Sequence, residues 1–370
     1  MRCPLLGMAA LAALATGCGM PAWFGTAGLP PEIAKDVPYA ILLDALRSGQ
    51  PPLEASAAET FMEADRPPPL EFVEALTDAP DARVRTTALA LAGLTRRPTL
   101  APVFQRRADD ASPAVRLAAA FGQAMTGDPS QAVALRDALG SPDVTLRRTA
   151  AWLLGLMGNP TAIGMLRLKL DDPDAIVALR AAEALHRLGS KDGIEQVRTL
   201  TEHERHQVRY YATRLLGRLG ATADIPRLER LCQSRYLDVK FASIASLAQL
   251  GDLKRINLLL EVLDQRDAEA RILAVRQLGE TAYTPAIGRL EKLLKSRSVQ
   301  ERTAAAEAII RIRSAQTSWR SRILADQPVI PTVPAPAPII PGTGVPSSPT
   351  SPVTPPSRPP PPPAPRLPRL

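Results

Sequence analysis

The side chains best suited to metal chemistry lie in one short segment, Glu202-His203-Glu204-Arg205-His206. Imidazoles and carboxylates are ligand types that zinc and iron accept. The sequence has only one other histidine, His186, and no further ligand lies at a fixed distance from this segment. We therefore expect a solvated polar turn here, with Glu202, His203 and His206 as weak metal-ligand candidates.

Other catalytic signals are missing from the sequence. It contains no glycine-rich phosphate loop and no nucleophile-elbow motif. Cys232 falls late on an expected helix, where a lone thiol is usually a small buried hydrophobic group rather than a nucleophile. We therefore predict a protein that is not an enzyme and that requires no cofactor.

The elements that would position any site come from a repeat of 31 residues. It occurs eight times between Val84 and Arg313 without insertion or deletion. Its anchor positions are Val84, Val115, Leu146, Val177, Val208, Val239, Ala270 and Glu301. A fixed period of this length is typical of a solenoid, so function should reside in a long interaction surface.

The pattern within each repeat predicts two helices. Small or apolar residues recur 4, 5 and 8 positions after the anchor, which places them on one face of a helix. Three residues before the anchor, six repeats carry a helix-capping residue: Asp81, Ser112, Asp143, Asp174, Asp267 and Ser298. Twelve residues after the anchor, five repeats carry a glycine suited to ending a helix: Gly127, Gly158, Gly189, Gly220 and Gly251.

Three stretches, Val84-Arg85, Leu146-Arg147-Arg148-Thr149-Ala150-Ala151 and Gly217-Arg218-Leu219-Gly220, resemble HEAT repeats. The short repeats of phycobilisome lyases are the most similar type, and the resemblance covers about three quarters of the chain. It implies an all-α fold, a right-handed α-solenoid (superhelix) of about nine 31-residue helical pairs. It does not imply lyase activity. The HEAT-like deoxyhypusine hydroxylases need several His-Glu pairs, and this sequence has only His203-Glu204.

The N-terminal residues are typical of an exported protein. Residues 1–17 combine Arg2 with a short apolar run, as a signal peptide does. The segment Ala15-Thr16-Gly17-Cys18 is similar to the lipobox of bacterial lipoproteins. That similarity implies cleavage before Cys18, a lipid anchor on Cys18, and a place at the outer membrane facing the periplasm. A cleaved, soluble secreted protein is the alternative.

Composition divides the rest of the chain. Residues 18–36 are expected to form a linker and residues 37–314 the solenoid, in which 37–66 is a degenerate repeat that caps the N-terminal end with one side facing water. Residues 315–327 would complete the C-terminal cap. Residues 328–370 hold 18 prolines and no acidic residue, which predicts a disordered, extended tail. Whether this tail is a spacer or a ligand stays open.

A basic residue follows the anchor in seven of the eight repeats: Arg85, Arg116, Arg147, Arg209, Lys240, Arg271 and Arg302. An acidic residue stands six positions before five anchors: Asp78, Asp109, Asp171, Glu202 and Asp264. We predict that these two sets form a structural ladder between neighbouring repeats. A stripe that binds a polyanion is the alternative.

The second helix of each pair usually lines the concave face, with positions 6 and 10 after the anchor turned outward. In the first three full repeats these positions are mainly apolar, and an exposed apolar stripe indicates a bound partner. The candidate contacts for a protein partner are Leu94, Phe121, Met125, Trp152 and Leu156. Packing of the same side chains between helices is an equal alternative.

A second surface combines basic and aromatic residues: Arg209, Tyr210, Tyr211, Arg214, Arg218, Arg235 and Tyr236. With a formal charge of +8, such a patch suits a polyanion. Export argues against nucleic acid and favours an anionic cell-wall polymer or an acidic protein as the ligand of this patch. The sequence thus predicts a protein-interaction scaffold at the bacterial envelope. The alternative is a binder of an anionic polymer, through this patch and the cationic tail.

Overall fold

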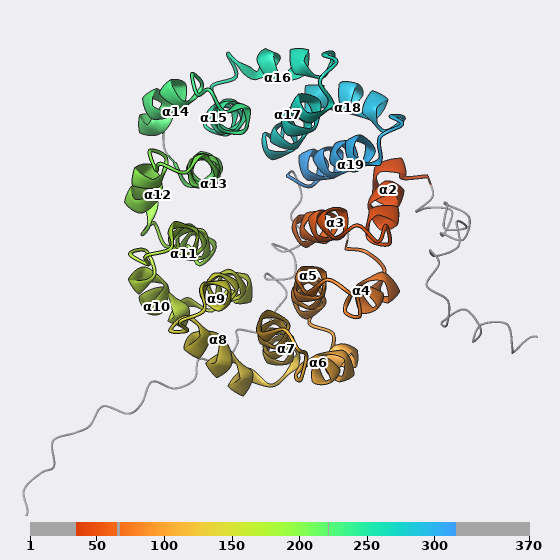
Figure 1. Ribbon diagram of the computed structural model, residues 1–370, viewed down its shortest axis with the longest axis vertical. Coiled ribbons are helices and arrows are strands. Elements are labelled where there is room, and N and C mark those ends of the chain that lie inside the picture. Colours follow the sequence, from red (N-terminus) through yellow and green to blue (C-terminus); the bar gives the residue numbers. More distant parts are fainter. Residues whose placement is uncertain (1–34, 65–66, 221, 316–370) are drawn as a thin grey trace, which may run out of the picture. The chain divides into compact units, whose positions relative to one another are not determined.

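The structure, a computed structural model, describes residues 35–64, 67–220 and 222–315 (Figure 1). Within these ranges it contains helices and connections but no strand. Cys18, most of the expected linker 18–36, the expected cap 315–327 after Ala315, and the segment 328–370 lie outside the described residues. The all-α prediction is confirmed.

The described helices form nine consecutive pairs. The first helices are α2 (Val37–Ala45), α4 (Leu70–Leu76), α6 (Ala101–Arg107), α8 (Ala132–Ala138), α10 (Ile163–Leu168), α12 (Ile194–Leu200), α14 (Ile225–Leu231), α16 (Ile256–Val262) and α18 (Ile287–Leu293). The second helices are α3 (Pro51–Glu63), α5 (Ala82–Leu94), α7 (Pro113–Thr126), α9 (Val144–Met157), α11 (Ala175–Arg187), α13 (His206–Leu219), α15 (Leu237–Gln249), α17 (Ala268–Glu280) and α19 (Val299–Ser314). Short 3-10 turns precede five first helices: η1 (Pro98–Leu100), η2 (Pro129–Gln131), η3 (Pro160–Ala162), η4 (Thr222–Asp224) and η5 (Thr284–Ala286).

The second helices begin where the capping pattern predicts. Side chains of Asp81, Asp143, Asp174, Asp267 and Ser298 accept hydrogen bonds from first-turn backbone N–H groups, whereas Ser112 does not. Arg205 and Tyr236, which lack a suitable acceptor, provide no side-chain cap to α13 and α15. Each cap is worth about 1 kcal/mol, so these two helices depend more on packing.

The glycines twelve residues after the anchor end their helices as expected, with one exception. Gly158 has φ 74° and closes α9 in the left-handed region, where a side chain would be strained. Gly220, which follows α13, is the exception because it has φ −67° and is itself in an extended conformation. Gly220 is therefore the one glycine of the five that ends its helix without a positive φ.

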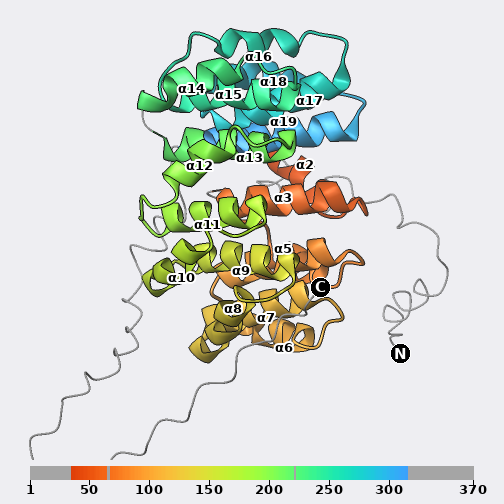
Figure 2. The ribbon, with the colours of Figure 1, turned by 60° about the vertical axis from the view of Figure 1, so that its left-hand side comes forward.

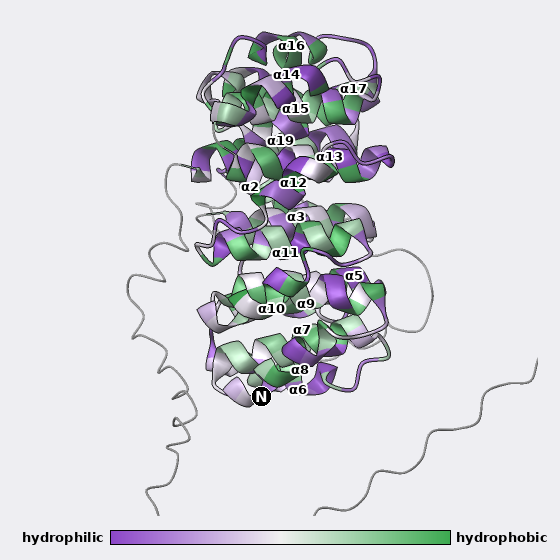
Figure 3. Cartoon of the chain, turned by 90° about the vertical axis from the view of Figure 1, so that its left-hand side faces the viewer, coloured by the Kyte–Doolittle hydropathy of each residue, from purple (hydrophilic) through white to green (hydrophobic). Residues whose placement is uncertain are grey.

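The pairs are arranged as a ring, with the second helices inside and the first helices outside (Figure 1). Polar and apolar residues mix along the outer helices α10 and α12, as expected for helices with one face in water (Figure 3). The inner helices pack closely on their neighbours. A Cβ atom placed on Gly155 of α9 would lie 2.8 Å from the Cα of Ala184 in α11.

The ring is closed by contact between the first and the last pair. Helix α19 packs against both α2 and α3, and Figures 1 and 2 show α2 beside α19. Ala306 of α19 is fully buried in the same apolar cluster as Leu42 of α2 and Phe61 of α3. The prediction that residues 37–66 form a cap with one side in water is therefore wrong, because that side meets α19.

Candidate functional site

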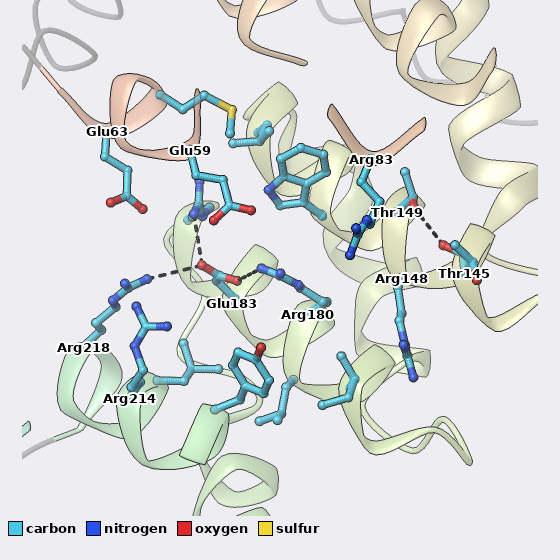
Figure 4. Close-up of a pocket in the computed structure, with 18 of the residues that line it drawn as sticks. Glu59, Glu63, Arg83, Thr145, Arg148, Thr149, Arg180, Glu183, Arg214 and Arg218 are labelled. Atoms are coloured by element: carbon cyan, nitrogen blue, oxygen red, sulfur yellow. Dashed lines mark hydrogen bonds and ion pairs between the residues drawn. The ribbon is translucent and has the colours of Figure 1, made fainter. Parts of the chain in front are cut away.

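The inner helices line an open cavity of about 640 Å³ (Figure 4). Its wall is formed by residues of α3, α5, α9, α11, α13 and α19, so both ends of the repeat array contribute. Seven arginines and three glutamates line it, together with several apolar side chains. The closed ring is what brings these groups together.

Glu183 of α11 is the acceptor for three arginines. Its Oε1 atom lies 3.0 Å from Nη2 of Arg187 and 3.4 Å from Nη1 of Arg218, and its Oε2 atom lies 3.0 Å from Nη1 of Arg180. Burial by itself would raise the pKa of this carboxyl, but the three guanidinium charges outweigh burial and lower the pKa to about 2. Glu183 is therefore ionised throughout the neutral range.

Glu280 of α17 forms a second cluster behind the cavity wall. Its two carboxylate oxygens each lie 2.6 Å from one guanidinium, Oε1 from Arg214 and Oε2 from Arg218. Arg311 approaches Glu280 Oε1 at 3.8 Å and also donates to Glu63 of α3 at 3.2 Å. Burial would raise the pKa of Glu280, but these arginines hold it far below its ordinary value. An ion network thus spans the closure between α3 and α19.

Glu59 of α3 differs from the other carboxylates of the wall. No hydrogen bond or ion pair joins it to another described residue, although the charges of Arg180, Arg311 and Arg214 act on it. Its side chain is accessible to water, yet protein surrounds it, and the resulting desolvation raises its pKa above the ordinary value. This carboxylate is an acceptor that nothing in the described residues satisfies.

Two of the predicted partner contacts line the cavity and three do not. Trp152 and Leu156 of α9 form part of its apolar wall, with Leu156 mostly covered. Phe121 is fully buried and touches the position where a side chain on Gly93 would lie, so it packs between α5 and α7. Leu94 is buried and Met125 packs against the same core. The prediction that all five residues form one open apolar stripe is therefore wrong.

The predicted basic and aromatic patch is divided between two places. Tyr211, Arg214 and Arg218 line the cavity, and Tyr210 accepts a hydrogen bond from Gln277 of α17. Arg209 and Arg235 instead flank the ring of Tyr236, with their guanidinium carbons 5.2 Å and 4.9 Å from its centroid. The expectation of one continuous patch for a polyanion is wrong.

The ladder of basic residues has a structural role, but with different partners from those expected. Arg85 binds Asp110, Arg147 binds Asp172, and Arg271 binds Glu301, each in the next repeat. Most ladder arginines also donate to carbonyl oxygens five and six residues earlier: Arg85, Arg116, Arg147, Arg209 and Arg302. Arg271 donates to the carbonyl of Gln265 only, and the Lys240 side chain makes no hydrogen bond or ion pair to another described residue.

The acids predicted to complete the ladder lie six residues before the anchor, whereas Asp110 and Asp172, which pair with ladder arginines, lie five residues before it. Asp78, Glu202 and Asp264 pair instead with Arg107, Arg227 and Arg289 of the following first helices. Asp110 and Asp172 are better placed because each also accepts from a backbone N–H two residues later, which fixes the carboxylate in its loop.

The weak metal candidates do not converge. Nδ1 of His203 accepts a backbone hydrogen bond from Arg205, whereas His206 lies 3.2 Å from Asp238 and stacks on Tyr236 at 4.5 Å between centroids. Among the described residues no group of three His, Cys, Asp or Glu side chains is placed to hold a metal. Cys232 is buried, as predicted, and burial raises the pKa of its thiol.

The repeat register contained a signal for the cavity that the sequence analysis did not use, because the positions concerned carry charged rather than apolar residues. Glu59 and Glu63 occupy positions 6 and 10 of the degenerate first repeat, counted from Leu53, and Arg214 and Arg218 occupy the same positions in a later repeat. These positions do face inward, as the pattern of the second helices predicts. Sequence alone did not show that they face one another.

Replacing Glu183 with glutamine is expected to lower the free energy of unfolding by roughly 2 to 3 kcal/mol at pH 7. Because the folded pKa lies below the unfolded one, this contribution is complete above the ordinary value of 4.5 and is lost as the pH falls towards about 2. Urea unfolding of the wild type and of Glu183→Gln should therefore show a smaller difference in the free energy of unfolding at pH 3 than at pH 7. Glu71→Gln, on the exposed side of α4, is the control, and an equal difference at both pH values would contradict this account.

Comparison with known proteins identifies the repeats. A family model described as HEAT repeats matches residues 100–168 and 165–248. Among solved structures, the CpcE–CpcF complex of phycocyanin lyase from Nostoc sp. PCC7120 is 19% identical, with a TM-score of 0.34, over 70% of this chain and 94% of that chain. Human deoxyhypusine hydroxylase is 18% identical, with a TM-score of 0.30, over 72% of this chain and 99% of that chain.

The comparison with curated proteins gave no match. None of the described helices is long and apolar enough to cross a membrane. The part of the chain that the family model matches consists of HEAT repeats, and the described helical pairs on both sides of it continue the same 31-residue pattern.

Proposed function

We propose that this protein is a non-enzymatic interaction scaffold that binds a partner protein inside its ring of helical pairs. The observation that carries the proposal is the cavity of about 640 Å³, on which side chains from six inner helices converge. HEAT repeats commonly present such a surface to other proteins, which supports the same function. The Glu183 cluster in the wall and the Glu280 cluster behind it favour a preformed site, because they hold the lining helices in fixed positions.

Trp152 is the proposed anchor for the partner, because a partly covered tryptophan in a concave wall contributes strongly to binding. Cross-linking in intact cells, followed by affinity capture of the tagged protein, should recover a defined protein partner. Trp152→Asp is expected to reduce that recovery at least tenfold and to leave the helical circular dichroism spectrum unchanged. Capture that is equal for both proteins would contradict a site inside the ring.

We also propose that the chain is exported and carries a lipid on Cys18 in the bacterial envelope, which the lipobox-like segment supports. Labelled palmitate should be incorporated into the wild-type protein, and Cys18→Ser should abolish the label and release the protein from the membrane fraction. Cys232→Ser is the matched control, since Cys232 is buried. Labelling that survives Cys18→Ser would exclude the anchor.

A further inference from the structure

The cavity wall presents both hydrogen-bond donors and acceptors. Helix α3 contributes the carboxylates of Glu59 and Glu63, and α11 contributes the guanidinium groups of Arg180 and Arg187 (Figure 4). Glu59 has no hydrogen bond or ion pair to another described residue, so its oxygens are free to accept. A ligand that satisfies this wall needs N–H donors as well as negative charge.

The arginine side of the cavity has more donors than the protein itself uses. Arg180 and Arg187 each give one hydrogen bond to Glu183, whereas a guanidinium carries five N–H groups. The Arg180 side chain is 40% exposed and the Arg187 side chain 23% exposed, and both line the cavity. These free N–H groups favour a carboxylate ligand, because guanidinium and carboxylate pair in a planar, two-bond geometry.

The remaining wall is apolar and limits the size of the ligand. Trp152, Leu156 and Leu179 border the charged groups, so an apolar side chain can be covered beside a carboxylate. A volume of about 640 Å³ lies in the range of small-ligand sites and encloses a few residues of extended chain. It is too small for a folded domain or a nucleic acid duplex.

We infer that this cavity binds an acidic, extended peptide segment of the partner protein, and this inference rests on the scaffold function proposed above. Carboxylates of the segment meet Arg180 and Arg187, backbone N–H groups donate to Glu59, and an apolar side chain covers Trp152. A phosphate polymer supplies no N–H donors along its backbone, so it would leave the Glu59 carboxylate without a hydrogen-bond partner. The chain's own residues 328–370 are unsuitable, because they contain no acidic residue and carry Arg358, Arg366 and Arg369.

The test uses the full-length protein and a fluorescein-labelled synthetic peptide of alternating Glu and Leu, with binding followed by anisotropy at low salt. Arg180→Gln and Arg187→Gln are each expected to weaken binding about tenfold, the loss of one charge-assisted hydrogen-bonded pair. Arg167→Gln is the matched control, since Arg167 pairs with Asp192 and both side chains are exposed outside the cavity. Arg180→Lys keeps the charge without the planar fork and should give an intermediate loss.

Three comparison probes decide the ligand class. The same peptide with Gln in place of Glu should bind at least tenfold more weakly, and short polyphosphate and single-stranded DNA should not compete for the site. Any one of three results would overturn the inference. The Gln peptide could bind as tightly as the Glu peptide, polyphosphate could bind more tightly than the Glu peptide, or both arginine variants could bind the Glu peptide with unchanged affinity.

Different results would contradict the proposed scaffold function and the inferred acidic ligand. A photo-cross-linking residue at Leu156, which lines the cavity, tests whether a partner enters the ring at all, using Leu258 on the outer helix α16 as the control position. Cross-linking at Leu156 but no binding of the acidic peptide would overturn the inference and leave the scaffold standing. No cross-linking at Leu156 in cells would overturn the scaffold function itself.

Discussion

Replacing Glu280 with glutamine is expected to lower the free energy of unfolding by about 3 to 5 kcal/mol, the largest loss from a single side chain that we predict. Glutamine keeps the shape of the side chain but removes the charge that three arginines share: Arg214, Arg218 and Arg311. The Glu280 side chain is only 8% exposed, so water replaces little of the lost interaction. Arg214 is then left without a paired carboxylate, whereas Arg218 and Arg311 keep only Glu183 and Glu63, and this excess of positive charge destabilises the fold.

Urea unfolding, followed by circular dichroism at pH 7, measures this loss. Glu229→Gln is the matched control, because the Glu229–Arg255 pair has a similar separation of 3.1 Å but lies in water, where such pairs contribute about 0 to 1 kcal/mol. A loss below about 1 kcal/mol for Glu280→Gln would mean that the arginines of the inner helices do not depend on this carboxylate.

Replacing Ala306 with glutamate is expected to open the ring between its first and last pair. Ala306 is fully buried among residues of α2 and α3, where a carboxylate would lose its hydration without gaining a partner. The expected loss of stability is about 3 kcal/mol. Small-angle X-ray scattering should show a larger radius of gyration, and hydrogen exchange should show lost protection in α2 and α3.

Arg313→Gln is the control for this variant. Arg313 also lies near the closure, 3.7 Å from Asp36, but its side chain is 47% exposed and the change should cost at most about 0.5 kcal/mol. If Ala306→Glu left the scattering and the exchange of α2 unchanged, the contact between α19 and α2 would not be what holds the ring closed.

Local features of the fold could be predicted because short-range chemistry determines them. Asp81, Asp143 and Asp174 cap their helices where the sequence places them, since a side chain needs only its own first turn to do so. The assignment of second helices to the inner face was also confirmed, because Trp152 and Arg214 line the cavity. It could be predicted because these positions recur in a fixed register along the repeats.

Closure of the ring could not be predicted in the same way. It depends on the small rotation between neighbouring repeats, summed over nine pairs, and no single residue encodes that sum. The site was mispredicted for the same reason. Glu59 and Arg180 are far apart in sequence and line the same cavity only because the ring is closed, whereas Phe121 belongs to the local packing of α5 and α7.

Closure also restricts how the chain can change in length during evolution. An open solenoid can gain or lose a repeat because each unit touches only its neighbours. Here the rotations of the nine described pairs must add up to a full circle for α19 to reach α2. Duplication of one repeat would separate Arg311 from Glu63 and disrupt the cavity, so the cavity depends on the number of repeats.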